Sequence, residues 1–252
     1  MILTITYATD EQRSLAENLA QQLKLDCLPV TDSQNQLVLN VTPTHLEMRD
    51  LEHKVAIHVD FISGALAHRR QYGGGKNQPL GKAVGLKPGI TPSVLDATAG
   101  LGKDSFVLAT LGCPIVMIER SPFVAALIQD AIQRAATDES FIPLLKNGFT
   151  LINTNAVEYI PAITYDKKPD VIYLDPMYPE KQKSALVKKN MQILQKLLGH
   201  DEDTEQLLTV ARHCAKKRVV VKRPKGAEFI GNIKPAFDVA SKNTRYDVYL
   251  PI

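Results

Sequence analysis

The chain has 252 residues, of which 44% are hydrophobic and 23% are charged, and its formal net charge is +3. These values suit a globular protein with a full core, in one large domain or one and a half; the mild basicity permits a nucleic-acid partner without requiring one. Three widely separated cysteines without a C-x-x-C pair argue against a disulfide framework or a zinc site. The start of the chain lacks a signal-peptide pattern, and no apolar run approaches the roughly 20 residues of a membrane span, so we expect a cytoplasmic protein without membrane contact.

The first part of the chain predicts a small α/β subdomain. Residues 2–8 have the pattern of a strand, and residues 10–25 that of a helix with Asp10 as its candidate N-cap. Short strands separated by turns are expected within residues 35–50 and 54–61.

A glycine-rich and basic stretch follows at residues 63–89. Its three consecutive glycines, Gly73 to Gly75, cannot lie inside a stable helix or strand. We therefore predict a functional loop or linker between two domains. The expected division is an N-terminal subdomain at residues 1–85, with a possible RNA contact, and a catalytic domain at residues 86–252.

From residue 93 the sequence alternates between expected strands and helices. The strands are expected at 93–100 (leading into a glycine turn), 114–120, 149–156, 170–176, 218–224 and 245–251, and the helices at 104–112, 122–137, 184–199 and 204–215. Strands that alternate with helices predict βαβ units and a mainly parallel, doubly wound sheet. Such sheets bind ligands beyond the carboxyl ends of their strands.

The turn after the first of these strands, LDATAGLGKDS, is a candidate cofactor loop. It fails the phosphate-binding pattern G-x-x-x-x-G-K-[ST] at both ends, and it matches the dinucleotide fingerprint only in part because Ser105 stands in the third glycine position. A methyltransferase loop needs an acid at the end of the strand and then G-x-G, and Asp96, Gly100 and Gly102 supply these. The acid suits a cofactor that carries a sulfonium and an ammonium.

Polar residues also end the next two strands. Glu119 ends the second strand, where an acid can accept hydrogen bonds from both ribose hydroxyls of a nucleoside. Asn155 and Ala156 follow the third strand, where we expect an adenine ring to be held. A glycine loop followed by these residues in this order predicts a nucleoside-containing cofactor.

The fourth strand ends in the motif LDPMYP. This motif resembles the D/N-P-P-Y/F signature of methyltransferases that act on the amines of nucleobases, with Met177 in place of the second proline. Asp175 and the carbonyl of Pro176 can accept hydrogen bonds from a planar amine, and proline presets the direction of that carbonyl. Tyr178 can stack on the base. We therefore predict Asp175, Pro176 and Tyr178 as the catalytic residues, with Asp175 as a possible proton acceptor.

Longer stretches of the chain resemble the bacterial small-subunit (16S) ribosomal RNA guanine-N2 methyltransferase family, RsmJ. The resemblance is strongest from Val59 to Pro224 and is carried by VDFISGALAHRRQYGGGK, DATAGLGKDSFVLA, ERSPFVAAL, YLDPMYPEKQKSALVKK and KRVVVKRP. It implies a class I Rossmann-like methyltransferase that uses S-adenosylmethionine to methylate the exocyclic N2 amine of one guanosine near the 3′ end of small-subunit rRNA. By motif position it places cofactor contacts at Lys103, Asp104, Glu119, Arg120, Asn155, Ala156 and Asp175.

Three basic stretches are expected to bind the RNA and to surround the same carboxyl edge of the sheet. The candidate contacts are Arg69, Arg70, Lys76, Lys181, Lys183, Lys188, Lys189, Lys222 and Arg223. A single charge run is usually a solvated surface, but an RNA substrate needs phosphate neutralisation around the site.

Two other kinds of methyltransferase fit the sequence poorly, and two further alternatives stay open. A ribose 2′-O-methyltransferase needs a Lys-Asp-Lys-Glu set, and Lys103 comes too late in the chain to be its first lysine. A pyrimidine C5 enzyme needs a cysteine nucleophile at a strand end, which neither Cys113 nor Cys214 provides. The alternatives are methylation of another planar amine, on adenine N6 or a protein side chain, and a non-catalytic RNA-binding or assembly factor. We expect no metal, and rRNA or a ribosomal subunit as partner.

Overall fold

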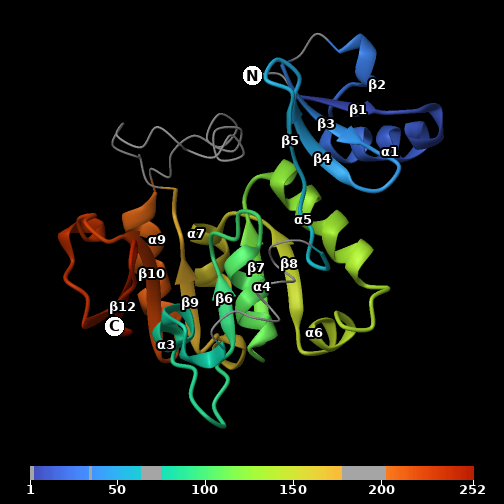
Figure 1. Ribbon diagram of the computed structural model, residues 1–252. Helices are drawn as coiled ribbons and strands as arrows, with labels where there is room; N and C mark the ends of the chain where they lie inside the picture. The colour runs from blue at the N-terminus through green and yellow to red at the C-terminus, as the bar shows by residue number, and fades with distance from the viewer. Residues whose placement is uncertain (1–2, 34–35, 64–74, 178–202) are drawn as a thin grey trace. The chain divides into compact units, whose positions relative to one another are not determined.

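A computed structural model describes residues 3–33, 36–63, 75–177 and 203–252 (Figure 1). The described residues form two compact units. The first contains residues 3–60, Ser121–Ala135 and Met177, and the second contains Phe61–Arg120, Ala136–Pro176 and residues 203–252. Within the described residues, no helix combines the length and the apolarity needed to cross a membrane.

The first unit is built on a five-stranded sheet in the order β2-β1-β3-β4-β5. Its strands are β1 (Thr4–Tyr7), β2 (Cys27–Pro29), β3 (Leu37–Val41), β4 (Leu46–Asp50) and β5 (Val55–Ile57). β1 runs parallel to β2 and β3, whereas β4 pairs antiparallel with both β3 and β5. The helices of this unit are α1 (Arg13–Leu23) and α5 (Pro122–Ala135).

The first helix begins later than the sequence predicted. Asp10 opens a short 3₁₀ turn, Asp10–Gln12, and the hydroxyl of Thr9 donates to the side chain of Gln12 at 2.6 Å across that turn. α1 starts only at Arg13, so the prediction that Asp10 caps it was wrong.

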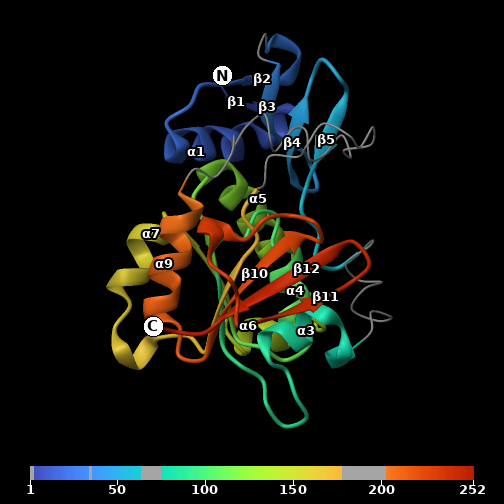
Figure 2. The ribbon, with the colours of Figure 1, turned by 90° about the vertical axis from the view of Figure 1, so that its left-hand side faces the viewer.

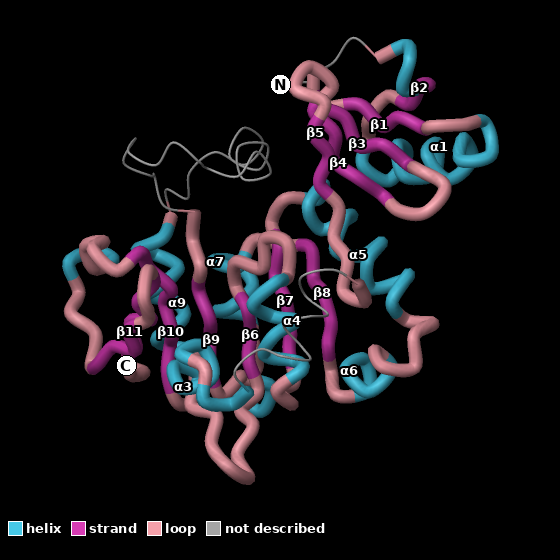
Figure 3. The backbone as a smooth tube through the Cα atoms, viewed as in Figure 1, coloured by secondary structure: helices cyan, strands magenta, loops and turns pink. Residues whose placement is uncertain are grey.

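The second unit contains a seven-stranded sheet in the order β11-β12-β10-β9-β6-β7-β8 (Figures 1 and 3). Its strands are β6 (Val94–Asp96), β7 (Ile115–Glu119), β8 (Phe149–Asn153), β9 (Val171–Leu174), β10 (Arg218–Pro224), β11 (Phe237–Ala240) and β12 (Thr244–Tyr249). The five strands from β10 to β8 in this order are parallel, and β12 pairs antiparallel with both β10 and β11. The mainly parallel α/β sheet that the sequence predicted is confirmed.

Helices cover both faces of this sheet, as the view in Figure 2 shows. They are α3 (Pro79–Val84), α4 (Lys103–Thr110), α6 (Ile142–Lys146), α7 (Ala156–Tyr159) and α9 (Thr204–Cys214). β11, α3, α6 and α7 were not predicted from the sequence. They are short, and β11 is mostly exposed, so neither an apolar period nor a long run marks them.

Apolar side chains from alternate strand positions pack on each face. On the face of α7 and α9, buried residues of the central strands form one cluster with both helices; its strand members include Leu95, Ile172, Leu174, Val219 and Val221. On the opposite face Phe61, Phe106, Phe141 and Phe149 form a second cluster, with neighbouring ring centroids 5.2 to 6.5 Å apart. Burial of each such apolar side chain contributes about 1.5–3 kcal/mol to the free energy of unfolding. The clusters on both faces therefore stabilise the sheet.

The described end of the predicted linker belongs to the second unit. Pro79 begins α3, and Gly85 ends it in the left-handed conformation at φ 85°. α3 packs against β10, β11 and β12. The predicted loop or linker over residues 63–89 therefore contains a helix at Pro79–Val84, and along the chain the first unit passes into the second between Asp60 and Phe61. Residues 64–74 lie outside the described chain.

The order of the strands reverses direction between β6 and β9. From β6 the chain builds outward through β7 to β8 on one side, and it then returns to add β9 and β10 on the other side. In open α/β sheets, ligands bind beyond the carboxyl ends of the strands at such a switch point. Asp96 ends β6 and Asp175 directly follows β9, so the two predicted acids lie at this point.

Candidate active site

The carboxylate of Asp96 holds the loop that follows β6. This residue is only 2% exposed. One of its carboxylate oxygens accepts the backbone N–H of Thr98 at 3.2 Å, and the other accepts the hydroxyl of Ser105 at 2.5 Å. Burial raises the pKa of Asp96 to about 7, although both hydrogen bonds oppose this shift. Asp96 therefore fixes the loop from within, and both of its carboxylate oxygens already accept hydrogen bonds there, which does not favour the direct cofactor contact that we predicted for it.

This buried carboxyl is expected to make the stability of the chain depend on pH. Its pKa is about 7 in the folded chain and about 3.9 in an unfolded one. The folded state therefore binds the proton more tightly, and the free energy of unfolding falls as the pH rises through this window, by at most about 1.4 kcal/mol per pH unit from this group. Above about pH 7 this contribution is constant.

We expect Asp96→Asn to remove that component of the pH dependence. Urea unfolding at about pH 5 and about pH 8 measures the slope in both chains. Ser105→Ala is the matched control, because it removes a hydrogen bond to Asp96 but keeps the carboxyl. Equal slopes in the wild-type and Asp96→Asn chains would contradict the assignment.

Two glycines shape the turn between β6 and α4. Gly100 and Gly102 have φ values of 53° and 69°, in the left-handed region that side chains rarely adopt. A Cβ atom on Gly102 would also lie 3.2 Å from the ring of Phe61 and 3.4 Å from the sulfur of Met117. The predicted tight glycine turn is confirmed, and Gly102 is required for packing as well as for the backbone.

Glu119 ends β7 beside this turn. The residue is 6% exposed, and its carboxylate accepts the backbone N–H of Gly100 at 3.0 Å. The backbone carbonyl of Glu119 accepts the side-chain amide of Asn153 at 2.7 Å and the N–H of Thr154 at 3.2 Å. These bonds connect the ends of β6, β7 and β8, so the Glu119 carboxylate is held at the carboxyl edge next to the glycine turn.

Asn155 and Ala156 form the start of α7 at the same edge. Asn155 is the N-cap, and its side-chain oxygen accepts the backbone N–H of Val157 at 2.9 Å. Ala156, the first residue of the helix, is 6% exposed. This capping role gives Asn155 a structural function in addition to the adenine contact, which stays a prediction.

Asp175 leaves the sheet at the switch point and contacts the loop after β6. Its backbone N–H donates to the hydroxyl of Thr98 at 2.6 Å. Its side chain is 39% exposed and accepts a hydrogen bond from Lys222 at 2.8 Å. Pro176 is buried directly after it. Tyr178, the third predicted catalytic residue, lies outside the described residues.

Lys222 joins Asp175 to Asp104. Its ammonium lies 2.8 Å from a carboxylate oxygen of each residue. The same oxygen of Asp104 accepts the hydroxyl of Tyr173 at 2.7 Å. Burial raises the pKa of Tyr173 well above its ordinary value, as do the carboxylates of Asp104 and Asp175, so this hydroxyl stays a hydrogen-bond donor.

The register of two parallel strands explains this cluster. β9 and β10 pair Tyr173 with Val220. Side chains alternate between faces, so Asp175 and Lys222, each two positions further along, emerge as neighbours on the face of α4. The sequence had assigned Asp104 and Asp175 to the cofactor, Asp175 also to catalysis, and Lys222 to the RNA, and it missed Tyr173 and Thr98. That these side chains are neighbours became visible only once the register of β9 against β10 was known.

The two remaining cofactor candidates lie at the same edge. Lys103 is exposed in the first turn of α4. Arg120 follows β7, and its guanidinium forms an ion pair with Asp203 at 3.3 Å, just before α9. A cofactor contact stays a prediction for both.

Most predicted RNA contacts lie outside the described residues, and one does not fit its surroundings. The residues outside are Arg69, Arg70, Lys181, Lys183, Lys188 and Lys189, and Lys76 lies in the short 3₁₀ turn Gly75–Asn77. Arg223 is only 5% exposed and donates to the backbone carbonyl of Glu228 at 2.8 Å. Its burial does not favour a contact with an RNA phosphate.

The basic run around β10 is split between the two ends of that strand. Lys217 forms an ion pair with Asp170 at 3.0 Å, and Arg218 donates to the carbonyl of Ala83 at 3.1 Å. Both residues lie at the amino end of β10, whereas Lys222 and Lys225 lie at or beyond its carboxyl end. A strand of this length separates the ends by roughly 20 Å. The prediction that the whole run surrounds the carboxyl edge was therefore wrong.

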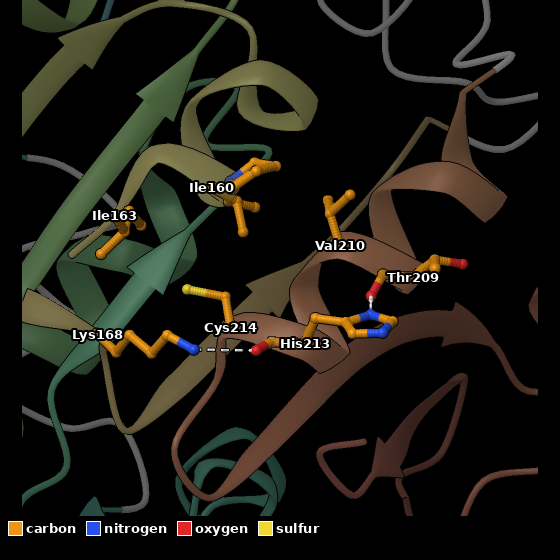
Figure 4. Close-up of a pocket in the computed structure, with 8 residues that line it drawn as sticks. Ile160, Ile163, Lys168, Thr209, Val210, His213 and Cys214 are labelled. Atoms are coloured by element: carbon orange, nitrogen blue, oxygen red, sulfur yellow. Dashed lines mark hydrogen bonds between the residues drawn. The ribbon is translucent and has the colours of Figure 1, made fainter. Parts of the chain in front are cut away.

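A cavity of about 410 Å³ lies between α9 and the segment that follows α7 (Figure 4). Ile160, Pro161, Ile163 and Val210 supply its apolar wall, and Lys168, Thr209, His213 and Cys214 complete it. Lys168 and Cys214 precede β9 and β10 respectively, so the cavity lies toward the amino ends of the strands, away from Asp175. Burial raises the pKa of the Cys214 thiol, which argues against a nucleophile there.

Comparison with known proteins agrees with this geometry. The family model described as "Putative SAM-dependent methyltransferase" matches residues 18–251. The chain is 51% identical to ribosomal RNA small subunit methyltransferase J of Aeromonas hydrophila over 237 residues, which cover 93% of this chain and 92% of that protein. It is 45% identical to the protein of the same name from Nitrosococcus oceani over 248 residues, covering 98% and 97% of the two chains.

A solved structure shares the fold across almost the whole chain. The crystal structure of a SAM-dependent methyltransferase from Neisseria gonorrhoeae matches with a TM-score of 0.76 at 37% identity, and the match covers 98% of this chain and 95% of that one. The family match thus extends over nearly the full length of a chain that also has the strand order, the glycine turn and the acids at the carboxyl edge. The chain belongs to the family of SAM-dependent methyltransferases.

Proposed function

We propose that this protein transfers a methyl group from S-adenosylmethionine to the exocyclic N2 amine of a guanosine in small-subunit (16S) ribosomal RNA. The observation that carries the proposal is the position of Asp175-Pro176 at the switch point of a methyltransferase sheet, in a chain 51% identical to a ribosomal RNA small subunit methyltransferase J. The proposed partner is therefore small-subunit rRNA or a ribosomal subunit.

The residues at the carboxyl edge fit S-adenosylmethionine. Gly100 and Gly102 let the backbone turn closely, and a Cβ atom on Gly100 would meet no atom nearer than the Thr98 carbonyl at 4.0 Å, so this side of the turn is open. Glu119 offers a fixed carboxylate for the ribose hydroxyls. When bound, the cofactor supplies a methyl group on a sulfonium.

The local charge of the site also suits a cation. Asp104 and Asp175 carry two negative charges and Lys222 carries one positive charge, so this group of three is net negative. A sulfonium and an ammonium are attracted to such a site, whereas a bare phosphate is repelled.

On the substrate side, Asp175 and Pro176 orient the amine. The lone pair of an exocyclic amine is delocalised into its base, so both of its N–H groups must be held to aim that lone pair. The Asp175 carboxylate accepts one N–H and the Pro176 carbonyl the other, and the amine loses a proton to Asp175 or to water once it has been methylated.

The test is methyl transfer to RNA with a labelled cofactor. Small-subunit rRNA transcribed in vitro and assembled subunits from a strain lacking the gene are the two substrates. We expect label in N2-methylguanosine after digestion to nucleosides, with at least one substrate. Label in N6-methyladenosine or in ribosomal protein would instead support another planar amine. Binding of rRNA without any transfer would support an assembly factor.

A further inference from the structure

The ammonium of Lys222 is held between two carboxylates at the centre of the candidate active site. Its distances to Asp104 and Asp175 are both 2.8 Å, and its side chain is 28% exposed. The three residues come from α4, the end of β9 and β10, and a fourth residue, Tyr173, adds a third contact through its hydroxyl bond to Asp104. Lys222 is thus placed by the register of the sheet and by a helix, not by a surface loop.

The charge state of Lys222 follows from its neighbours. Burial acts to lower its pKa, but the carboxylates of Asp175 and Asp104 together outweigh burial and raise it. Lys222 therefore stays an ammonium at all physiological pH values and cannot act as a general base. In return, an ammonium in contact with Asp175 favours the ionised form of that carboxyl.

We propose that Lys222 is the positioning residue for Asp175. It fixes the rotation of the carboxylate, and hence the direction from which the carboxylate accepts an N–H of the target amine, and it keeps the carboxylate ionised. Asp104 also holds the ammonium, and the hydroxyl of Tyr173 donates to Asp104 in turn. The role in methyl transfer rests on the proposed function, but the ion pair itself can be tested without it.

This inference replaces an RNA phosphate contact as the role of Lys222. The two carboxylates already neutralise the ammonium, and the net negative charge of the group opposes the approach of a phosphate. The two roles predict different results: a phosphate contact contributes to RNA affinity, whereas a positioning residue contributes to kcat.

The variants for the test are Lys222→Met, Lys222→Arg and Lys225→Met. Lys222→Met keeps the length of the side chain and removes its charge, and Lys222→Arg restores a cation. Lys225→Met is the matched control, because Lys225 is an exposed lysine just beyond the carboxyl end of the same strand. Thermal melts of all three establish that they fold.

The first measurement uses the protein without cofactor or RNA. Carboxyl-¹³C aspartate labelling, with Asp175→Asn to assign the signal, gives the pKa of Asp175 by NMR titration. We expect a higher pKa in Lys222→Met, a value near wild type in Lys222→Arg, and no change in Lys225→Met. An unchanged pKa in Lys222→Met would overturn the inference, whatever the substrate of the protein is.

The second measurement uses rRNA and S-adenosylmethionine. We expect Lys222→Met to lower kcat by about 10- to 100-fold, to move the acid limb of the pH profile to higher pH, and to leave the Kd for rRNA within about twofold of the Lys225→Met value. A loss of RNA affinity with kcat retained would overturn the inference in favour of a phosphate contact. Absence of methyl transfer by the wild-type protein would count against the proposed function alone, since the titration is independent of it.

Discussion

Replacement of Asp175 by alanine is expected to lower kcat by about 10²- to 10⁴-fold, the range typical of a positioned acid–base group. Asp175 links the loop after β6, the end of β9 and Lys222, through its backbone bond to Thr98 and its side-chain ion pair. Without the carboxylate, the amine loses one of its two acceptors. A methyl-transfer assay at saturating RNA and cofactor measures the change.

Asp175→Asn is the informative companion variant, because it keeps an oxygen acceptor and the backbone bond to Thr98 but removes the charge. We expect its kcat to lie between those of the wild type and Asp175→Ala. Both variants should keep the fold, since the side chain is 39% exposed and lies outside the apolar clusters. Full activity of Asp175→Ala would falsify the catalytic assignment, and a collapse of its melting transition would make Asp175→Asn the deciding variant.

The second large effect is expected at Glu119. Replacement by alanine should weaken binding of S-adenosylmethionine by about 10- to 150-fold, because a hydrogen bond to a charged group is worth about 1.5–3 kcal/mol. The carboxylate also accepts the N–H of Gly100, so its loss frees one side of the glycine turn. Isothermal calorimetry gives the Kd.

Glu119→Gln and Glu119→Asp separate these two contributions. Glutamine keeps one acceptor at the same reach, and aspartate keeps the charge but shortens the side chain. We expect glutamine to lose less affinity than alanine. Equal Kd values for the wild-type and Glu119→Ala proteins would show that the ribose contact lies elsewhere.

The sequence predicted those residues of the site that lie at the ends of strands. Asp96, Glu119 and Asp175 each end an apolar run or follow it directly, and the parallel topology brings such ends to one edge. Their individual roles were harder to assign. Asp96 and Glu119 are both buried and differ in their bonds: Asp96 accepts Thr98 and Ser105, and Glu119 accepts the N–H of Gly100. No sequence pattern records those bonds.

Cross-strand partners could not be predicted without the register. Lys222 and Arg223 are adjacent in a basic run, yet one faces α4 and Asp175 while the other is buried with its guanidinium against a backbone carbonyl. The alternation of side chains along a strand places the two residues on opposite faces of the sheet. Only the pairing of Tyr173 with Val220 shows which of them lies next to Asp175. Similarly, the linker composition of residues 63–89 concealed α3, whose contacts with β10 to β12 are all distant in sequence.

The packing of Gly102 against Phe61 has a thermodynamic consequence. The turn rests on the phenylalanine cluster, so its conformation is preorganised by the same apolar burial that stabilises the second unit. Little conformational entropy then remains to be lost when a ligand binds at the turn. By linkage, a ligand that binds only the intact turn must raise the melting temperature of the chain. A smaller side chain at position 61 would loosen the turn, and it is therefore expected to weaken the binding of the same ligand.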